Sequence, residues 1–223
     1  MTQNKTAIDL KTDYHAHILP GCDHGSDSVE TSLKQLKMAK SAGVETICAT
    51  PHFYPNNESV KSFLSRRSRT FEKLKAASAK NDPKILLGAE VLICDGMDRM
   101  EHLPDLCLEG TSELLLEMPF YEWPDNIWDT VFSLNDIEEL DIVIAHADRY
   151  PPKNIEVLID AGIPLQLNAG SLTHVLRRSK YMSWIENGYV AYIGSDIHGL
   201  GDGYREFEKS VRLIKHRLGI QET

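Results

Sequence analysis

Asp13-Tyr14-His15-Ala16-His17 and Ser195-Asp196-Ile197-His198 lie near the two ends of the chain, and each closes a strand-like run with histidine or carboxylate side chains. Between them, four more such residues follow runs of Ile, Val or Leu: His52, Glu90, Glu117 and His146. Side chains so far apart in sequence meet only if the strands lie side by side and point the same way. The pattern therefore predicts a parallel α/β barrel with a multi-metal site at the C-terminal mouth of its strands.

Segments typical of strands and of helices alternate along the chain. The expected strands cover residues 9–14, 44–50, 85–93, 114–118, 142–145, 165–168 and 189–194. Helical periodicity indicates helices within residues 27–43, 57–80, 126–140, 152–161 and 204–218. We expect Asp27 to cap the first helix, with Glu30 completing a capping box. Seven strand–helix units predict a distorted (β/α)7 barrel of the TIM type.

The rival topology is a doubly wound open sheet. An open sheet would collect ligands at one switch point, whereas nearly every strand of this chain ends in a ligand-type residue. Strands that are almost continuously apolar also favour parallel pairing with both faces buried. We therefore favour the barrel.

Composition limits the class of protein. The chain has 223 residues, 24 Lys and Arg, 33 Asp and Glu, and a formal net charge of −9. This length predicts one domain over residues 1–223, and the charge argues against nonspecific binding of nucleic acid. Residues 1–11 are polar, and no apolar run approaches the roughly 20 residues of a membrane helix. We expect a cytoplasmic protein without an export signal or membrane insertion.

The cysteines argue against one common phosphatase mechanism. A cysteine phosphatase loop needs Arg six residues after its Cys. The positions six residues after Cys22, Cys48, Cys94 and Cys107 hold Ser28, Tyr54, Met100 and Glu113. The sequence also contains no GxSxG nucleophile elbow, no Walker loop and no CxxC pair, so free thiols are expected.

Pairs of residues at the strand ends have the spacing of metal ligands. His15 and His17 are two residues apart in a strand, so their side chains share a face. Asp196 and His198 repeat this spacing after the last strand, which a barrel places beside the first. Each pair alone is a weak signal, but the two pairs reinforce each other.

Carboxylates that follow buried strands support the same interpretation. Glu90 and Glu117 each come directly after an apolar run, where a charge is costly unless it is paired or ligated. A salt bridge would explain one of them, but two, together with His146 after an apolar run, favour a metal site. Mixed nitrogen and oxygen ligands suit Zn, Mn or Fe better than Ca or Mg.

Other candidate residues have two interpretations each. His24, in the turn before the first helix, is either a ligand or a solvated loop residue. Arg149 offers a fork suited to phosphate oxygens, or else a salt bridge to Asp148 or another acid at the rim. The run Arg66-Arg67-Ser68-Arg69 is typical of a solvated helix face, and the alternative is a role in docking the substrate. Three histidines follow no strand and are expected to be structural or at the surface: His102, His174 and His216.

The ordered set of motifs resembles the polymerase and histidinol phosphatase (PHP) superfamily. The motifs cover residues 13–21, 49–52, 87–90, 144–150, 166–172 and 195–198. Within the superfamily, the chain is similar to the bacterial tyrosine-protein phosphatases encoded with capsule and exopolysaccharide systems. The resemblance extends from Asp13 to Arg205, and the set in this order is far more specific than any one motif.

The resemblance implies a PHP fold, a distorted seven-stranded barrel that holds three divalent metal ions. It implies one ion on His15, His17, Glu90 and Asp196, a second on Glu90, Glu117 and His146, and a third on His24, His52 and His198. These phosphatases usually have Asp where His24 stands, and His-Pro-Glu-Arg-Tyr where this chain has His-Ala-Asp-Arg-Tyr, which keeps Arg149. Their Arg-Pro after the last motif is absent, and Arg205 is the candidate for its role.

The implied function is metal-dependent hydrolysis of phosphotyrosine on a protein. A metal-activated water would attack phosphorus, and Arg149 would neutralise the phosphoryl oxygens. The implied partner is an autophosphorylating bacterial tyrosine kinase that controls polysaccharide export. Alternatives are a small-molecule phosphatase acting on an ester such as histidinol phosphate, an amidohydrolase-type metal hydrolase, and a non-catalytic, metal-bound partner of a kinase.

Overall fold

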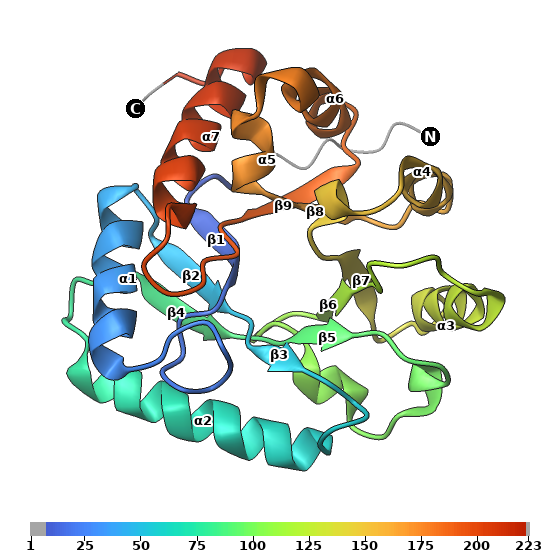
Figure 1. Ribbon diagram of the computed structural model, residues 1–223, viewed down its shortest axis with the longest axis horizontal. Helices are drawn as coiled ribbons and strands as arrows, with labels where there is room; N and C mark the ends of the chain where they lie inside the picture. The colour runs from blue at the N-terminus through green and yellow to red at the C-terminus, as the bar shows by residue number, and fades with distance from the viewer. Residues whose placement is uncertain (1–7, 222–223) are drawn as a thin grey trace.

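Parallel strands form the centre of the fold in the computed structural model, which describes residues 8–221 (Figure 1). They are β1 (Thr12–Ala16), β2 (Thr46–Ala49), β3 (His52–Phe53), β4 (Lys84–Leu87), β5 (Glu90–Leu92), β6 (Glu113–Glu117), β7 (Asp141–Ile144), β8 (Leu165–Asn168) and β9 (Val190–Gly194). Hydrogen-bonded neighbours give two sheets, in the orders β1-β2-β4 and β3-β5-β6-β7-β8-β9. Residues 1–7, on which part of the export prediction depends, lie outside the described residues.

The two sheets continue into one another through two kinked strands. The third expected strand is split at Gly88 into β4 and β5, and the second is followed by the separate short β3. Pro51 lies between β2 and β3 and has no N–H to donate to a ladder. Hydrogen bonds cross the kink nonetheless, from the Gly88 N–H to the Ala49 carbonyl at 2.9 Å and from the Glu90 N–H to the Pro51 carbonyl at 3.2 Å. Seven strand positions therefore follow one another around the core.

The segment after β9 meets β1 through a small number of backbone contacts. The Asp196 N–H donates to the His15 carbonyl at 2.8 Å, and the His17 N–H donates to the Ile197 carbonyl at 3.2 Å. An isolated parallel bridge joins the same two segments. The expected parallel α/β architecture is confirmed, but among residues 8–221 no continuous ladder joins β9 to β1, so the sheets do not close into a continuous barrel.

A buried carboxylate strengthens that seam. Asp13, in β1, accepts hydrogen bonds from the Ser195 N–H at 2.7 Å and from the Ser195 hydroxyl at 2.6 Å. The Ile197 N–H in turn donates to the Ser195 hydroxyl oxygen at 3.2 Å. The seam therefore holds the loop that carries Asp196 in a fixed position against β1.

Helices cover the outside of the strands (Figure 1). They are α1 (Val29–Ser41), α2 (Val60–Ala77), α3 (Asp125–Asn135), α4 (Pro152–Asp160), α5 (Ala169–Thr173), α6 (Val175–Glu186) and α7 (Gly203–Leu218), with 3-10 turns at η1 (Met97–Arg99), η2 (Leu103–Leu106) and η3 (Ala147–Arg149). The sequence predicts α1, α2, α3, α4 and α7 but not α5 or α6. The start of α6 exposes Val175 and Leu176, which blurs its apolar stripe.

Two local expectations are wrong. The N-cap of α1 is Ser28, whose side-chain oxygen accepts the Thr31 N–H at 3.2 Å, while Asp27 accepts the Thr31 hydroxyl. The Arg66–Arg69 run is not a fully solvated face, because Arg67 is buried and donates to the Gly88 carbonyl at 2.7 Å. Among the described helices, none combines the length and the apolar content that a membrane span requires.

Candidate metal centre

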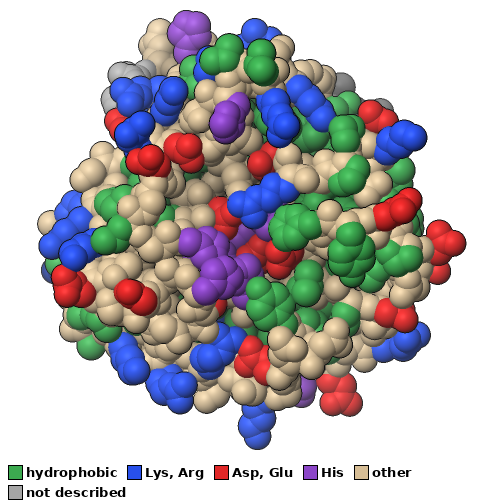
Figure 2. Space-filling view, in the orientation of Figure 1, with side chains coloured by type: hydrophobic (Ala, Val, Ile, Leu, Met, Phe, Trp, Pro, Cys, Tyr) green, Lys and Arg blue, Asp and Glu red, His purple; other side chains and the backbone are tan. Residues whose placement is uncertain are grey.

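The side chains expected as metal ligands converge at the carboxyl ends of the strands. Figure 2 shows histidines gathered in a hollow of this face, next to acidic side chains, with basic and hydrophobic side chains around them. His15 lies in β1, His17 and His24 lie in the loop after it, His52 begins β3, Glu90 begins β5, Glu117 ends β6, His146 follows β7, and Asp196 and His198 follow β9. Parallel pairing brings these ends together, as the spacing predicts.

Glu90 lies at the centre of this cluster. Its Oε2 atom is 3.2 Å from Nε2 of His15, 3.2 Å from Nε2 of His17 and 2.9 Å from Nδ1 of His52. Its Oε1 atom is 2.7 Å from Nε2 of His146. One buried carboxylate thus faces four imidazole nitrogens, an arrangement suited to a carboxylate that is shared between cations.

Two further carboxylates flank Glu90. Oδ1 of Asp196 lies 3.7 Å from Nε2 of His15 and 3.5 Å from Nε2 of His17, and Oε2 of Glu117 lies 3.8 Å from Nδ1 of His52. Three groups have ligand atoms within 4.8 Å of one another: His15, His17 and Asp196; His17, His52 and His198; His52, Glu90 and Glu117. The groups share residues, as they would around neighbouring ions.

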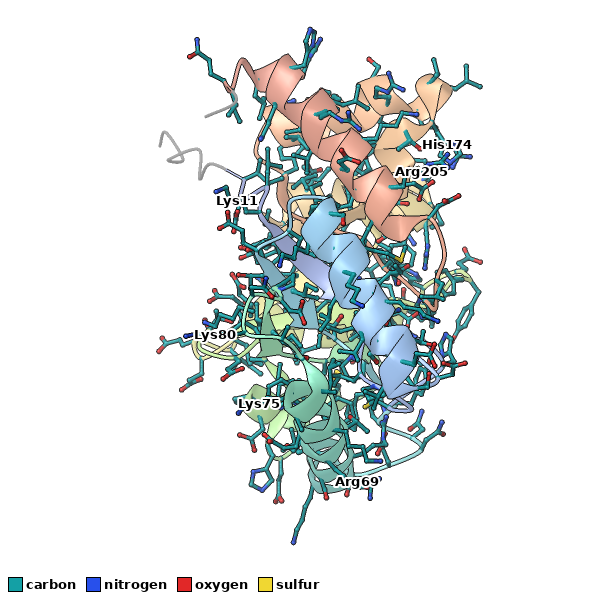
Figure 3. The ribbon with its side chains drawn as sticks, turned by 90° about the vertical axis from the view of Figure 1, so that its left-hand side faces the viewer. Lys11, Arg69, Lys75, Lys80, His174 and Arg205 are labelled. Carbon is teal, nitrogen blue, oxygen red and sulfur yellow. The ribbon has the colours of Figure 1, made fainter. Side chains whose placement is uncertain are left out.

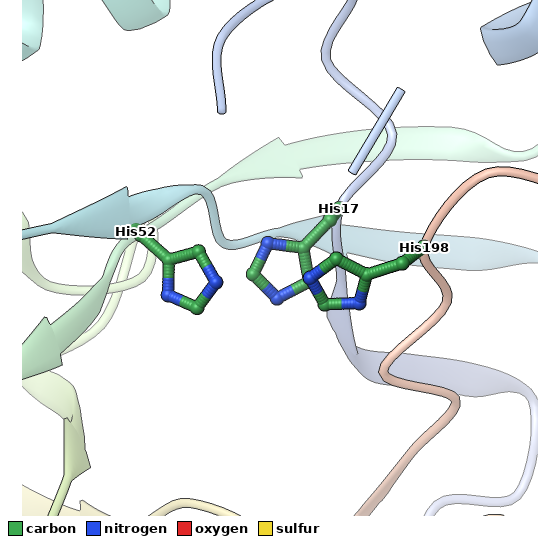
Figure 4. Close-up of side chains that lie close together, drawn as sticks. All are labelled: His17, His52 and His198. Carbon is green, nitrogen blue, oxygen red and sulfur yellow. The ribbon is translucent and has the colours of Figure 1, made fainter. Parts of the chain in front are cut away.

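Imidazoles from separate segments make up the outer part of the cluster. Figure 4 shows His17, His52 and His198 close together, with ring centroids 4.1 Å apart for His17 and His198 and 4.5 Å apart for His17 and His52. The exposed His24 ring stacks on both His52 and His198, with centroids 4.7 Å apart in each case. His24 therefore belongs to the cluster spatially and is not an isolated loop residue.

Several buried polar atoms of the cluster have no hydrogen-bond partner among the described residues. They are Nδ1 and Nε2 of His52, Oε2 of Glu90 and Nε2 of His198, and the 2.9 Å contact between Nδ1 of His52 and Oε2 of Glu90 lacks hydrogen-bond geometry. A buried polar atom without a partner costs free energy unless a bound group satisfies it. These unsatisfied nitrogen and oxygen atoms point into one shared space, so the residues fit divalent cations.

The hydrogen bonds behind His15 and His17 lead to the same conclusion. Nδ1 of His15 lies 3.2 Å from Oε1 of Gln166, and Nδ1 of His17 lies 2.8 Å from Oδ2 of Asp23. Because both outer partners are acceptors, each Nδ1 carries the proton, and each neutral ring then presents a lone pair on Nε2. The two Nε2 atoms are only 3.1 Å apart. Two facing lone pairs repel unless a cation or a proton lies between them.

The charges of the cluster depend on one another. Burial raises the pKa of Glu90, but His15 and His146 outweigh it and hold that pKa well below its usual range. Burial lowers the pKa of His17, but hydrogen bonds to Asp196, Asp23 and Glu90 raise it well above the ordinary value. Without a metal, the cluster therefore stays intact by holding protons on imidazoles next to carboxylates.

Other members have pKa values suited to ligands. Burial and the charge of His17 lower the pKa of His198 to about 4, and burial lowers the pKa of His146. Both rings are therefore neutral near pH 7 and have a free lone pair. Burial and the charge of Glu90 raise the pKa of Glu117 to about 7. A bound cation would favour the charged form of this carboxylate.

Two candidate ligands have strained backbones. His146 has φ of 32° and Asp196 has φ of 50°, in the left-handed region that non-glycine residues seldom adopt. The His146 N–H is held by Oε1 of Gln166 at 2.6 Å, and its Nδ1 lies 3.0 Å from the hydroxyl of Tyr150. The surrounding hydrogen bonds keep both residues in this conformation, which turns their side chains into the cluster.

Arg149 lies at the edge of the cluster and reaches Asp196. It donates to Oδ2 of Asp196, and Nδ2 of Asn168 donates to the same oxygen at 2.9 Å. The side chain of Arg149 is 43% exposed. It lines a cavity of about 720 Å³ that also touches Asp196, His198 and Phe120. Arg149 thus pairs with Asp196 rather than with Asp148 and still faces the cavity.

Arg205 does not approach the candidate ligands. Its side chain is 83% exposed, and its Nη1 atom lies 3.7 Å from Oδ1 of Asp202, the residue just before α7. It lines a separate surface pocket between α1 and the start of α7, with Lys37 and Glu208. Arg205 is therefore not among the residues that we propose to bind the phosphoryl group.

The sequence also matches a known family over almost its whole length. The family described as capsular polysaccharide synthesis, CpsB/CapC, matches residues 11–223. The chain belongs to the CpsB/CapC family. The resemblance to capsule-type phosphatases stated from the motifs is thereby confirmed.

Relatives of this CpsB/CapC protein are phosphatases by name. It is 27% identical over 220 residues to the tyrosine-protein phosphatase YwqE of Bacillus subtilis, covering 94% of this chain and 85% of YwqE. It is 29% identical over 204 residues to CapC of Staphylococcus aureus, covering 84% of this chain and 77% of CapC.

Solved structures show the same fold. A chain from the crystal structures of YwqE and of CpsB from Streptococcus pneumoniae, described as metal-dependent tyrosine phosphatases, matches with a TM-score of 0.77 and 22% identity. That match covers 94% of this chain and 88% of the other. The histidinol phosphatase-type protein HisK of Listeria monocytogenes matches with a TM-score of 0.53 and 14% identity, covering 87% and 99%.

The sequence did not reveal the residues that orient the candidate ligands of this CpsB/CapC protein. Gln166 touches both His15 and His146, but the sequence indicated it only as part of a strand and of the motif at residues 166–172. A fully buried Gln between apolar neighbours was the available signal, because such a side chain needs partners. Asp23 and Tyr150 gave no such signal, because their neighbours in sequence are ordinary loop residues.

Proposed function

We propose that this CpsB/CapC protein is a metal-dependent phosphatase that hydrolyses phosphotyrosine in proteins. The observation that carries the proposal is the convergence of nine imidazole and carboxylate side chains, several with unsatisfied atoms, beside a cavity that Arg149 lines. Bound divalent cations would supply Lewis acidity and a water that ionises near neutral pH. The names of YwqE and of the solved relatives support tyrosine phosphatase activity.

The ligand set proposed for these cations is the one expected from the motifs. His15, His17, Glu90 and Asp196 would hold one ion, with Glu90 shared. The remaining ligands would be Glu117, His146, His24, His52 and His198. Gln166 and Asp23 would orient the imidazoles and fix which nitrogen is free to bind. Manganese, iron and zinc all suit this mixture of nitrogen and oxygen ligands.

Arg149 is the residue proposed to bind the phosphoryl group. Asp196 occupies part of its guanidinium, and the rest faces the cavity. Five fixed N–H donors allow one guanidinium to contact Asp196 and phosphate oxygens together. Because charge on these oxygens is stabilised in the transition state, Arg149 would act on turnover more than on ground-state binding.

An aromatic wall beside the cluster supports an aryl phosphate as substrate. Phe120 follows β6, is 61% exposed, and stacks on His146 with ring centroids 5.8 Å apart. It also lines the cavity that Arg149 lines. A phenyl ring entering the cavity would stack on Phe120, while a small polar ester such as histidinol phosphate would gain less from it.

The proposed substrate is an autophosphorylated bacterial tyrosine kinase, and the proposed compartment is the cytoplasm. The family description, capsular polysaccharide synthesis, supports this setting. Tyrosinate leaves readily, because its pKa is about 10. The chemistry therefore depends little on a general acid.

A substrate comparison on metal-depleted and reconstituted protein tests the proposal. After exhaustive chelation we expect no hydrolysis of a phosphotyrosine peptide, with activity returning on addition of Mn, Fe or Zn. The reconstituted protein should prefer the peptide to histidinol phosphate by kcat/KM. Full activity without metal, or a preference for histidinol phosphate, would contradict it.

A further inference from the structure

The cavity beside the cluster extends well beyond the space that one phosphotyrosine side chain needs. It measures about 720 Å³ and extends from Phe120 and Arg149 to His174 and Arg177. His174 precedes α6, and Arg177 lies in its first turn. In Figure 3, His174 lies on the opposite side of the molecule from Lys11 and Lys80, which precede β1 and β4. The extension therefore lies on the face that carries the carboxyl ends of the strands.

The first turn of α6 exposes apolar side chains at this end of the cavity. Val175 is 77% exposed and Leu176 is 98% exposed. A single exposed leucine is ordinary, but two adjacent apolar residues beside a large cavity form a surface that a partner could cover. The core contacts of α6 come later in the helix, from Tyr181, Met182 and Ile185. Packing within the chain therefore does not account for the exposed pair.

Arg177 is the exposed cation of this turn that lines the cavity, where it hydrogen-bonds Tyr181. Its neighbours are already occupied: Arg178 donates to the Leu172 and Thr173 carbonyls, and Lys180 lies 4.6 Å from the ring centroid of Trp184. Among the described residues, no carboxylate forms an ion pair with Arg177.

The start of α7 gives the cavity lining the opposite charge. Asp202 and Glu206 line the cavity there. Acidic side chains of a bound chain would be repelled from α7 and attracted to Arg177. An acidic side chain of a bound segment is therefore favoured beside α6.

We propose that the first turn of α6, formed by His174, Val175, Leu176 and Arg177, binds the segment that flanks the phosphotyrosine of the substrate. This segment carries an acidic side chain that pairs with Arg177 and an apolar one that covers Leu176. The proposal rests on the phosphatase function above and adds its sequence preference. Affinity for this flank lowers KM and leaves the chemistry at the cluster as it is.

The test compares two phosphotyrosine peptides on the metal-reconstituted full chain. One peptide has Glu and Leu beside the phosphotyrosine, and the other has Gln and Ser at the same positions. We expect kcat/KM to favour the Glu/Leu peptide by about tenfold, and Arg177→Glu to abolish that preference. The matched control is Arg69→Glu, an exposed arginine on α2 outside the cavity, labelled in Figure 3. It changes the net charge equally and should keep the preference.

Leu176→Ser tests the apolar half of the surface. It should raise KM for the Glu/Leu peptide several-fold with kcat unchanged. A preference that survives Arg177→Glu, or that Arg69→Glu removes equally, would overturn the proposal. A dimer seen by sedimentation would also overturn the proposal if Leu176→Ser dissociated it and left the peptide preference unchanged. In that case a second copy of the chain, and not the substrate, would cover the surface.

Peptide binding measured by fluorescence anisotropy separates this proposal from the phosphatase proposal. Weaker binding of the Glu/Leu peptide to Arg177→Glu than to Arg69→Glu supports the docking surface even in protein that turns over no substrate. Absence of turnover with intact selective binding would contradict only the phosphatase function.

Discussion

At the scale of single residues, Glu90 contacts most of the cluster, and Gln166 holds the imidazole of His15 and the backbone of His146. Glu90 is the carboxylate that lies within 3.2 Å of His15, His17, His52 and His146. Gln166 uses one oxygen for both the His146 N–H and Nδ1 of His15. Both side chains are buried, so their partners have no water to replace them.

Gln166→Met removes these hydrogen bonds and keeps much of the side-chain volume. We expect metal affinity to fall by about 10–100-fold, because partners of metal-bound histidines usually contribute that much. Titration with a competing chelator measures the affinity, and circular dichroism checks that the fold persists. Unchanged affinity in a folded variant would show that Gln166 does not orient the ligands.

Arg149→Ala should lower kcat for a phosphotyrosine peptide by about 10²–10³-fold, because it removes stabilisation of the developing charge. Arg149 also contacts Asp196, so metal content must be measured in the same sample. We expect the metal to remain, since Asn168 still holds Oδ2 of Asp196. A wild-type rate would remove Arg149 from the mechanism.

At the scale of secondary structure, the seam between β1 and the segment after β9 depends on Asp13. This fully buried carboxylate accepts two hydrogen bonds from Ser195. Burial raises its pKa to about 6, although the hydrogen bonds from Ser195 oppose the shift. The folded state therefore binds this proton more tightly than the unfolded state does, and the contribution of Asp13 to stability improves as pH falls through about 6.

Ser195→Ala should destabilise the metal-free protein by about 1–3 kcal/mol, because it leaves a buried carboxylate short of a donor. The loss should be larger at about pH 8, where Asp13 is charged, than at about pH 5, where the folded form is mostly protonated. Urea unfolding measures both values. Ser68→Ala, at an exposed position of α2, is the control and should change stability by less than about 0.5 kcal/mol. An equal loss at both pH values would contradict the role of Asp13.

The sequence predicted most of the strands because each is a short apolar run that ends in a polar residue. It did not predict the kink at Gly88, because the expected strand runs through it, and it did not predict β3 after Pro51, because two residues are too few to show a strand pattern. It missed α6, whose first turn exposes its apolar residues. It indicated eight of the nine ligand-type residues, because strand order brings the strand ends together, whereas His24 was assigned only through the family resemblance. It could not place Arg205, because only the turn into α7 decides which way that side chain points.

At the scale of the whole molecule, metal binding should be linked to protons. The pKa values of Glu117, His15 and His17 are raised in the metal-free fold, so these groups hold protons that a cation must displace. Burial lowers the pKa of the two histidines and the neighbouring carboxylates raise it, whereas burial and the charge of Glu90 both raise the pKa of Glu117. Cations would also offset part of the net charge of −9.

We therefore expect metal affinity to fall as pH falls from about 8 to about 6, since Glu117 takes up a proton near pH 7. Calorimetry in buffers of different ionisation enthalpy should show protons released on binding. The melting temperature should rise with metal concentration, because cations bind the folded state. Affinity that is independent of pH would contradict the ligand assignment.

The most direct test is anomalous diffraction from crystals grown with manganese. We expect anomalous peaks at the cluster, each about 2.0–2.3 Å from its ligand atoms, with Glu90 bound to more than one ion. The metal-centre assignment would be contradicted if manganese bound elsewhere in the crystals, or if the histidines and carboxylates of the cluster stayed free of it.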